Sequence, residues 1–120
     1  MNTDITKNDS EQLLTSADSL ELDSFIDHLW LEDGLAKNTL SSYRLDLSAY
    51  AAYLKQQDKS LLSAEQGDIQ HYLAVKFPLS KPRSISRLIA SLRRFYRYQL
   101  RENKISLDPS LQIQSPKLPR

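Results

Sequence analysis

The chain has 120 residues, 40% of them hydrophobic, with a net charge of +1 and no cysteine. Such a length buries one small core, the lack of thiols excludes a disulfide framework and a thiolate zinc site, and no apolar run approaches the ~18 residues of a membrane span. Scarce glycine and few β-branched residues favour helices, so we expect one all-α domain in the cytoplasm, without a membrane partner.

The N-terminal part of the sequence predicts an unstructured arm followed by a first helix. Residues 1–17 are polar and acidic, with too few hydrophobic residues to offset the entropy of ordering, so we expect a disordered arm. The helix begins at Asp18, where Glu21 gives the spacing of a capping box, and it ends at Gly34. Its apolar residues recur at helical spacing and are Leu22, Phe25, Ile26, Leu29 and Trp30.

A second helix opens at Asn38 and Thr39, whose side chains can cap exposed amides, and fades in the polar run at residues 55–59. Its core stripe consists of Leu40, Tyr43, Leu47, Tyr50, Ala51 and Leu54. The opposite face, which we call the small-residue face, can approach a groove closely and consists of Ser41, Ser42, Leu45, Ala49 and Ala52.

The second half of the chain predicts two more helices. A shorter one spans about residues 66–77 and is closed by Pro78. A long one begins near Ser80, a candidate N-cap, and extends to about Asn103. Its apolar side predicts a core stripe of Ile85, Leu88, Ile89, Leu92, Phe95, Tyr96 and Leu100.

A last helical turn is indicated by Asp108 and the proline after it, and residues 114–120 are interpreted as the start of an extended linker. The folded domain is therefore expected to span residues 18–113. Its predicted fold class is all-α, a compact bundle of four main helices with a short C-terminal helical turn.

The opposite side of the fourth helix is continuously basic, and we call it the arginine stripe: Arg83, Arg87, Arg94, Arg97 and Arg101. Ser84 and Ser91 lie at one margin of the stripe, and Ser86 and Arg93 at the other.

A charged helix is more often a solvated outer face, but two features of the arginine stripe favour nucleic acid. A helix that only needs solubility usually interleaves glutamate with lysine, because like charges four residues apart repel by roughly 0.2–0.5 kcal/mol per pair. The stripe tolerates this repulsion, since Glu102 is the sole acid nearby. Arginine also suits phosphate and guanine edges better than lysine does. The lead-in to the second helix, at residues 37–39, adds a cation and short hydrogen-bonding side chains suited to a phosphate, although simple capping explains Asn38 and Thr39 equally well.

The sequence gives little indication of metal binding, cofactor binding or base stacking. His28 and His71 are isolated, so no metal site is expected, and the sequence contains no phosphate loop, nucleophile elbow or other cofactor motif. Most tyrosines fall on core stripes, and we expect only Tyr53 and Tyr98 to be exposed, so base stacking is not favoured.

The sequence resembles the N-terminal core-binding domain of Xer-type tyrosine recombinases, nearest to the XerD subfamily and next to the XerC subfamily. The resemblance covers roughly residues 20–120 and is carried by LWLEDGLAKNTLSSYRLDLSAYAAYL, DIQHYLA, SRLIASLRRFYRYQLRE and DPSLQIQSPKLPR. It implies a SAM-like bundle whose second and fourth helices cross the major groove of a recombination half-site. A C-terminal catalytic domain would clamp the other face of the DNA.

By position in these motifs, the family's DNA contacts fall on Thr39, Ser41, Ser42, Arg83, Ser84, Arg87, Ser91 and Arg94. With the residues that the charge pattern adds, the predicted DNA site consists of Lys37, Asn38, Thr39, Ser41, Ser42, Arg83, Ser84, Arg87, Ser91, Arg94, Arg97 and Arg101. Leu45 is apolar where the resemblance leads us to expect a polar or basic residue, and a thymine methyl or a sugar is the contact suited to it.

The resemblance also implies a tyrosine nucleophile assisted by arginine, lysine and histidine, including a His-x-x-Arg element. His28 is followed at the third place by Leu31 and His71 by Ala74, so neither makes this element. We therefore expect this chain to bind DNA without cutting it. In the full recombinase it would resolve chromosome dimers or integrate mobile elements at the bacterial nucleoid, beside a partner recombinase subunit on the adjacent half-site.

A protein-interaction role is the alternative. A helical module could dock its basic helix on an acidic partner, such as the N-terminal arm of the same chain. That alternative predicts little affinity for DNA, even at low salt.

Overall fold

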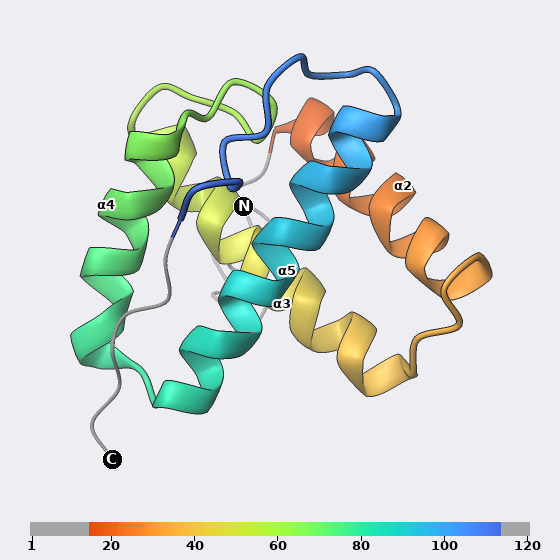
Figure 1. Ribbon diagram of the computed structural model, residues 1–120, viewed down its shortest axis with the longest axis horizontal. Helices are drawn as coiled ribbons and strands as arrows, with labels where there is room; N and C mark the ends of the chain where they lie inside the picture. Colours follow the sequence, from red (N-terminus) through yellow and green to blue (C-terminus); the bar gives the residue numbers. More distant parts are fainter. Residues whose placement is uncertain (1–14, 114–120) are drawn as a thin grey trace, which may run out of the picture. The chain divides into compact units, whose positions relative to one another are not determined.

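The computed structural model describes residues 15–113. They form four α-helices and one short 3₁₀ helix, in the order α2 (Ser16–Leu31), α3 (Lys37–Gln56), α4 (Gln66–Lys76), η1 (Phe77–Leu79) and α5 (Pro82–Arg101) (Figure 1). No strand occurs within this range, which confirms the all-α class. The linker predicted at residues 114–120, and all but the last three residues of the predicted arm, lie outside the described residues.

The chain divides into two compact units, which we call the N-terminal unit (residues 1–61) and the C-terminal unit (residues 62–120). In the N-terminal unit, α2 begins two residues before the predicted start at Asp18. Thr15 is the actual N-cap, because its Oγ1 accepts a hydrogen bond from the Asp18 amide at 3.1 Å. Asp18 is instead buried, and its Oδ1 accepts a hydrogen bond from the Leu61 amide at 3.0 Å.

The buried residues of α2 include Leu22, Phe25 and Leu29, as the periodicity predicts. Trp30 and Ile26 share the helical spacing but not the burial: Trp30 is 50% exposed and Ile26 is half-buried. The chain leaves α2 through Gly34, whose φ of 63° is the left-handed conformation that glycine adopts without a steric penalty. The Leu35 amide then returns to the Leu29 carbonyl at 3.2 Å.

Helix α3 begins at Lys37, with Ala36 as its N-cap, so the prediction that Asn38 and Thr39 cap this helix is wrong. The predicted core stripe of α3 is buried throughout. An ion pair between Arg44 Nη2 and Asp23 Oδ1 at 2.6 Å joins α3 to α2.

In the C-terminal unit, α4 opens with a capping box between Glu65 and Asp68. It ends at Lys76, and Pro78 lies inside η1, close to where the sequence predicts the helix to stop. Helix α5 then begins at Pro82.

The N-cap of α5 is Lys81, not the predicted Ser80. No side chain caps this helix, and proline at its first position removes one of the amide donors that a helix start otherwise leaves unsatisfied. The helix ends at Arg101, and Asn103, with φ of 60°, follows in the left-handed conformation. The Lys104 amide closes this end on the Gln99 carbonyl at 3.0 Å.

The segment after α5 forms the predicted turn at Asp108, although it does not complete a helix. Asp108 Oδ1 accepts hydrogen bonds from the backbone amide and the hydroxyl of Ser110, at 2.8 and 2.7 Å. Arg93 Nη2 donates to the Ile113 carbonyl at 2.8 Å, which anchors the end of this segment to α5.

The predicted core stripe of α5 is buried except for Leu100, which is 39% exposed. Gln99 is fully buried instead. The prediction for Leu100 is therefore wrong, because the centre of the buried face of α5 lies closer to Gln99 than to Leu100.

Candidate nucleic-acid interface

The arginine stripe lies on the surface of α5. Arg83, Arg87, Arg97 and Arg101 are exposed, and Arg94 is half-buried. Burial of the apolar face fixes the rotation of the helix, so the opposite face meets solvent. At 1.5 Å per residue, Arg83 and Arg101 are roughly 27 Å apart along the axis, the length of about eight base-pair steps. The stripe is therefore long enough to follow a duplex backbone or cross a groove.

The C-terminal end of the stripe has acidic neighbours. Arg101 Nε lies 3.8 Å from Glu102 Oε2, and the Arg101 guanidinium carbon lies 5.7 Å from the centre of the Tyr98 ring. Arg97 lines a hollow of about 110 Å³ together with Asp108 and Arg93. These acids reduce the positive charge available to a phosphate, so the potential is expected to be strongest at the N-terminal end of α5, where the helix dipole adds to it.

Ser91 does not belong to the exposed face. It is fully buried, and its Oγ donates to the Leu88 carbonyl three residues earlier at 2.7 Å. The prediction that Ser91 contacts DNA is therefore wrong. A serine within a helix commonly donates to a carbonyl three or four residues earlier, and this tendency was the available sign that Ser91 would not face a ligand. Ser84, at the same margin, is half-buried.

The predicted DNA-binding residues of α3 lie at the surface of the N-terminal unit. Lys37, Asn38 and Ser41 are exposed, and Thr39 and Ser42 are half-buried. Ala36 has no side chain able to cap the first-turn amides, so these groups remain available to a ligand. On the same helix, Leu45 is 55% exposed.

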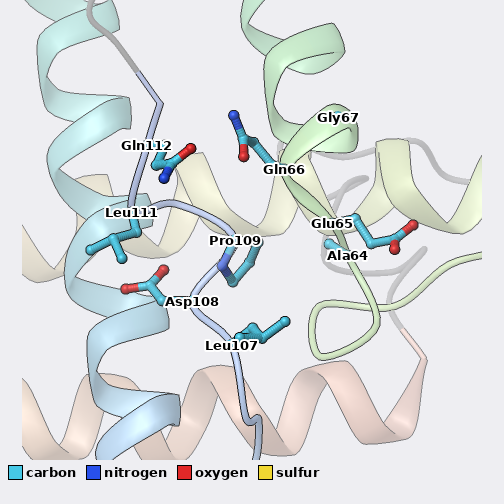
Figure 2. Close-up of a pocket in the computed structure, with 9 residues that line it drawn as sticks. All are labelled: Ala64, Glu65, Gln66, Gly67, Leu107, Asp108, Pro109, Leu111 and Gln112. Carbon is cyan, nitrogen blue, oxygen red and sulfur yellow. The ribbon is translucent and has the colours of Figure 1, made fainter.

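A larger cavity of about 640 Å³ lies in the C-terminal unit, between the start of α4 and residues 107–112 (Figure 2). The nine described residues that line it include Glu65 and Asp108 but no basic side chain, so it does not suit a phosphate. Figure 2 shows the two carboxyl groups pointing to opposite sides, away from each other. In this arrangement they do not form the paired acid and base of a hydrolytic site.

Metal and membrane chemistry find no support in residues 15–113. No group of three or more histidine, cysteine, aspartate or glutamate side chains in this range could hold a metal ion. His28 Nε2 lies 4.0 Å from Asp33 Oδ2, too far for a hydrogen bond. No described helix is both long and apolar enough to cross a bilayer. Tyr53 and Tyr98, which were expected to be exposed, are half-buried. The other four tyrosines, Tyr43, Tyr50, Tyr72 and Tyr96, are buried, as their core positions predict.

Comparison with known proteins agrees with the resemblance seen in the motifs. The family model described as "Phage integrase, N-terminal SAM-like domain" matches residues 22–103. The tyrosine recombinase XerD of Shewanella oneidensis is 47% identical over 100 residues, 82% of this chain and 33% of that protein. The tyrosine recombinases XerD of Pseudomonas putida and Proteus mirabilis are 43% and 42% identical, over 81% and 82% of this chain. The chain spans about a third of the length of these relatives.

Proposed function

The chain belongs to the family of phage integrase N-terminal SAM-like domains, and from this premise we propose that it binds duplex DNA at a recombination half-site. In this proposal it is the core-binding part of a Xer-type tyrosine recombinase. The XerD relatives, which are recombinases by name, support this assignment.

The observation that carries the proposal is the exposed arginine stripe of α5. Like charges along one helix face repel one another, and α5 itself contains no acidic residue. A polyanion relieves this repulsion directly, because each neutralised phosphate releases condensed counterions. The C-terminal unit concentrates this charge: residues 62–113 hold nine basic and four acidic residues.

The residues divide into two roles in this proposal. Arg83, Arg97 and Arg101 contact phosphates and fix the position of the domain on the duplex. Arg87 and Arg94 reach base edges in the major groove, where the arginine fork pairs with guanine.

On the N-terminal unit, the first turn of α3 holds a phosphate near Lys37 and Asn38, and the hydroxyls of Ser41 and Ser42 reach the groove. Thr39 supports the same contact from the half-buried side of the turn.

Strand cleavage and rejoining belong, in this proposal, to the part of the recombinases that this chain does not match. The assembled protein would act in chromosome dimer resolution or mobile-element integration, with a partner recombinase on the adjacent half-site. The role of the described helices is recognition.

A binding experiment tests the proposal. Duplexes that the chain retains from a random-sequence pool would be sequenced, and the best of them titrated by fluorescence anisotropy beside a scrambled duplex across a salt series. We expect selective binding at low salt that weakens steeply as salt rises. Failure to bind any duplex at low salt would refute the proposal and favour the protein-interaction alternative.

A further inference from the structure

Leu45 is the leucine of α3 that the fold leaves in water. It is 55% exposed, whereas Leu40, Leu47 and Leu54 of the same helix are 8%, 0% and 0% exposed. Single exposed leucines are common on protein surfaces, so exposure alone assigns no role. The surroundings of Leu45 decide what this side chain can do.

The neighbours of Leu45 on its face are short. Ser41 lies one turn before it and Ala49 one turn after it, and Ser42 flanks it. Leu45 is therefore the longest side chain of the small-residue face. When this face approaches another surface, the leucine makes the first contact and the serine hydroxyls follow beside it.

Charge does not explain a DNA contact in the middle of α3. The basic residues of the helix are Lys37 at its start, Lys55 in its last turn and Arg44 between them. The Arg44 guanidinium is held by Asp23 at 2.6 Å. Contact of the central turns with a duplex must then come from hydroxyl groups and from apolar surface.

The major groove offers one apolar group, the C5-methyl of thymine. We propose that Leu45 contacts this methyl group and selects a T·A pair within the half-site, an inference that rests on the DNA binding proposed above. Ser41 and Ser42 can bond to the polar edges of the same or the next base pair. Because 5-methylcytosine places an equivalent methyl group in the groove, Leu45 accepts a methylated C·G pair at that position better than an unmethylated one.

Replacing thymine by uracil tests the inference, because uracil lacks only the methyl group. Each thymine of the duplex selected by the 120-residue chain would be replaced in turn and the dissociation constant measured by anisotropy. One replacement should weaken the wild type about fourfold, the effect of burying one methyl-sized group. Leu45→Ala should bind the thymine duplex about fourfold more weakly and lose the distinction between thymine and uracil there.

Two further variants make the test specific. Leu45→Met keeps an apolar side chain of similar reach and should keep the distinction. Leu20→Ala removes a leucine that is 66% exposed on α2 of the same unit, and it should leave the distinction unchanged. At the sensitive position, 5-methylcytosine opposite guanine should bind the wild type more tightly than cytosine, and Leu45→Ala should bind both alike.

The outcomes separate this inference from the proposed function. If no duplex is enriched or bound, DNA binding itself fails. If the chain binds a selected duplex and Leu45→Ala, folded by circular dichroism, responds to every uracil replacement as the wild type does, Leu45 reads no methyl group. In that case the DNA-binding function stands and the inference is overturned.

Discussion

Asp18 and Leu61 are 43 positions apart in the chain, and the Asp18 carboxylate accepts a hydrogen bond from the Leu61 amide at 3.0 Å. The bond fixes the loop after α3 against the start of α2, within the N-terminal unit. The other carboxylate oxygen, Oδ2, is buried and has no hydrogen-bond partner among the described residues. Asp18 therefore provides the acceptor that the buried Leu61 amide needs, but its carboxylate loses hydration in doing so.

Asp18→Ala should destabilise the chain by ~1–3 kcal/mol, because it leaves the buried Leu61 amide unsatisfied. Removal from water raises the pKa of the Asp18 carboxyl above its ordinary value, and the hydrogen bond from Leu61 only partly offsets this. A raised pKa means that the folded state binds the proton more tightly, so this group adds stability as the pH falls through the raised pKa. The difference between wild type and Asp18→Ala should then be larger at pH 4, near the ordinary pKa of an aspartate, than at pH 7.

Urea unfolding followed by circular dichroism at the two pH values measures this difference. Asp27→Ala removes an exposed acid from the same helix and serves as the control. A difference that is constant or shrinks on acidification would contradict the buried-charge account of Asp18.

Arg83→Ala and Arg87→Ala should weaken DNA binding in different ways. Arg83 is placed on a phosphate, so Arg83→Ala should weaken binding to all duplexes alike and lower the salt slope by about 1. Arg87 is placed on a base edge, so Arg87→Ala should lose ~1–3 kcal/mol of binding free energy on the selected duplex and relax the preference at one base position. Lys55→Ala removes one exposed positive charge at the far end of α3 and should leave the slope near its wild-type value. Identical profiles for the two arginine variants would refute this division of roles.

Asp58→Gly should stabilise the N-terminal unit by about 1 kcal/mol. Asp58 has φ of 61°, which costs a residue with a side chain more than glycine, and its negative charge lies at the unfavourable C-terminal end of α3. Gln57→Gly, one residue earlier, is the matched control, because Gln57 has an ordinary φ of −94° and glycine there only adds freedom to the unfolded chain. Thermal unfolding should therefore move in opposite directions for the two variants.

Helical periodicity predicted both faces of α5 because burial repeats with the turn of the helix. Helix starts were predicted less well, since several nearby residues can cap and the backbone selects one of them. Thr15 caps α2 through the Asp18 amide, whereas the Asp18 carboxylate bonds to Leu61, a residue whose proximity only the tertiary structure provides. For the candidate site, the exposed arginines followed from the same periodicity, whereas the buried Ser91 did not.

Gln99 was missed for a related reason: a polar residue in the middle of an apolar face contributes nothing to the pattern that defines the face. On a helical wheel it falls between Leu92 and Phe95, closer to the centre of the buried side than Leu100 does. Position on the wheel would have identified it where residue type did not.

Gln99→Met should stabilise the C-terminal unit by ~1–3 kcal/mol. Gln99 is fully buried, and its Nε2 and Oε1 have no hydrogen-bond partner in the part of the chain that the structure describes. Methionine keeps the length and flexibility of the side chain while removing both unsatisfied polar atoms. Leu100→Met, at a 39% exposed position, is the matched control and should change little. Denaturant unfolding decides the matter: if Gln99→Met destabilises the chain, the buried amide makes a favourable contact and the stabilisation expected from removing it is refuted.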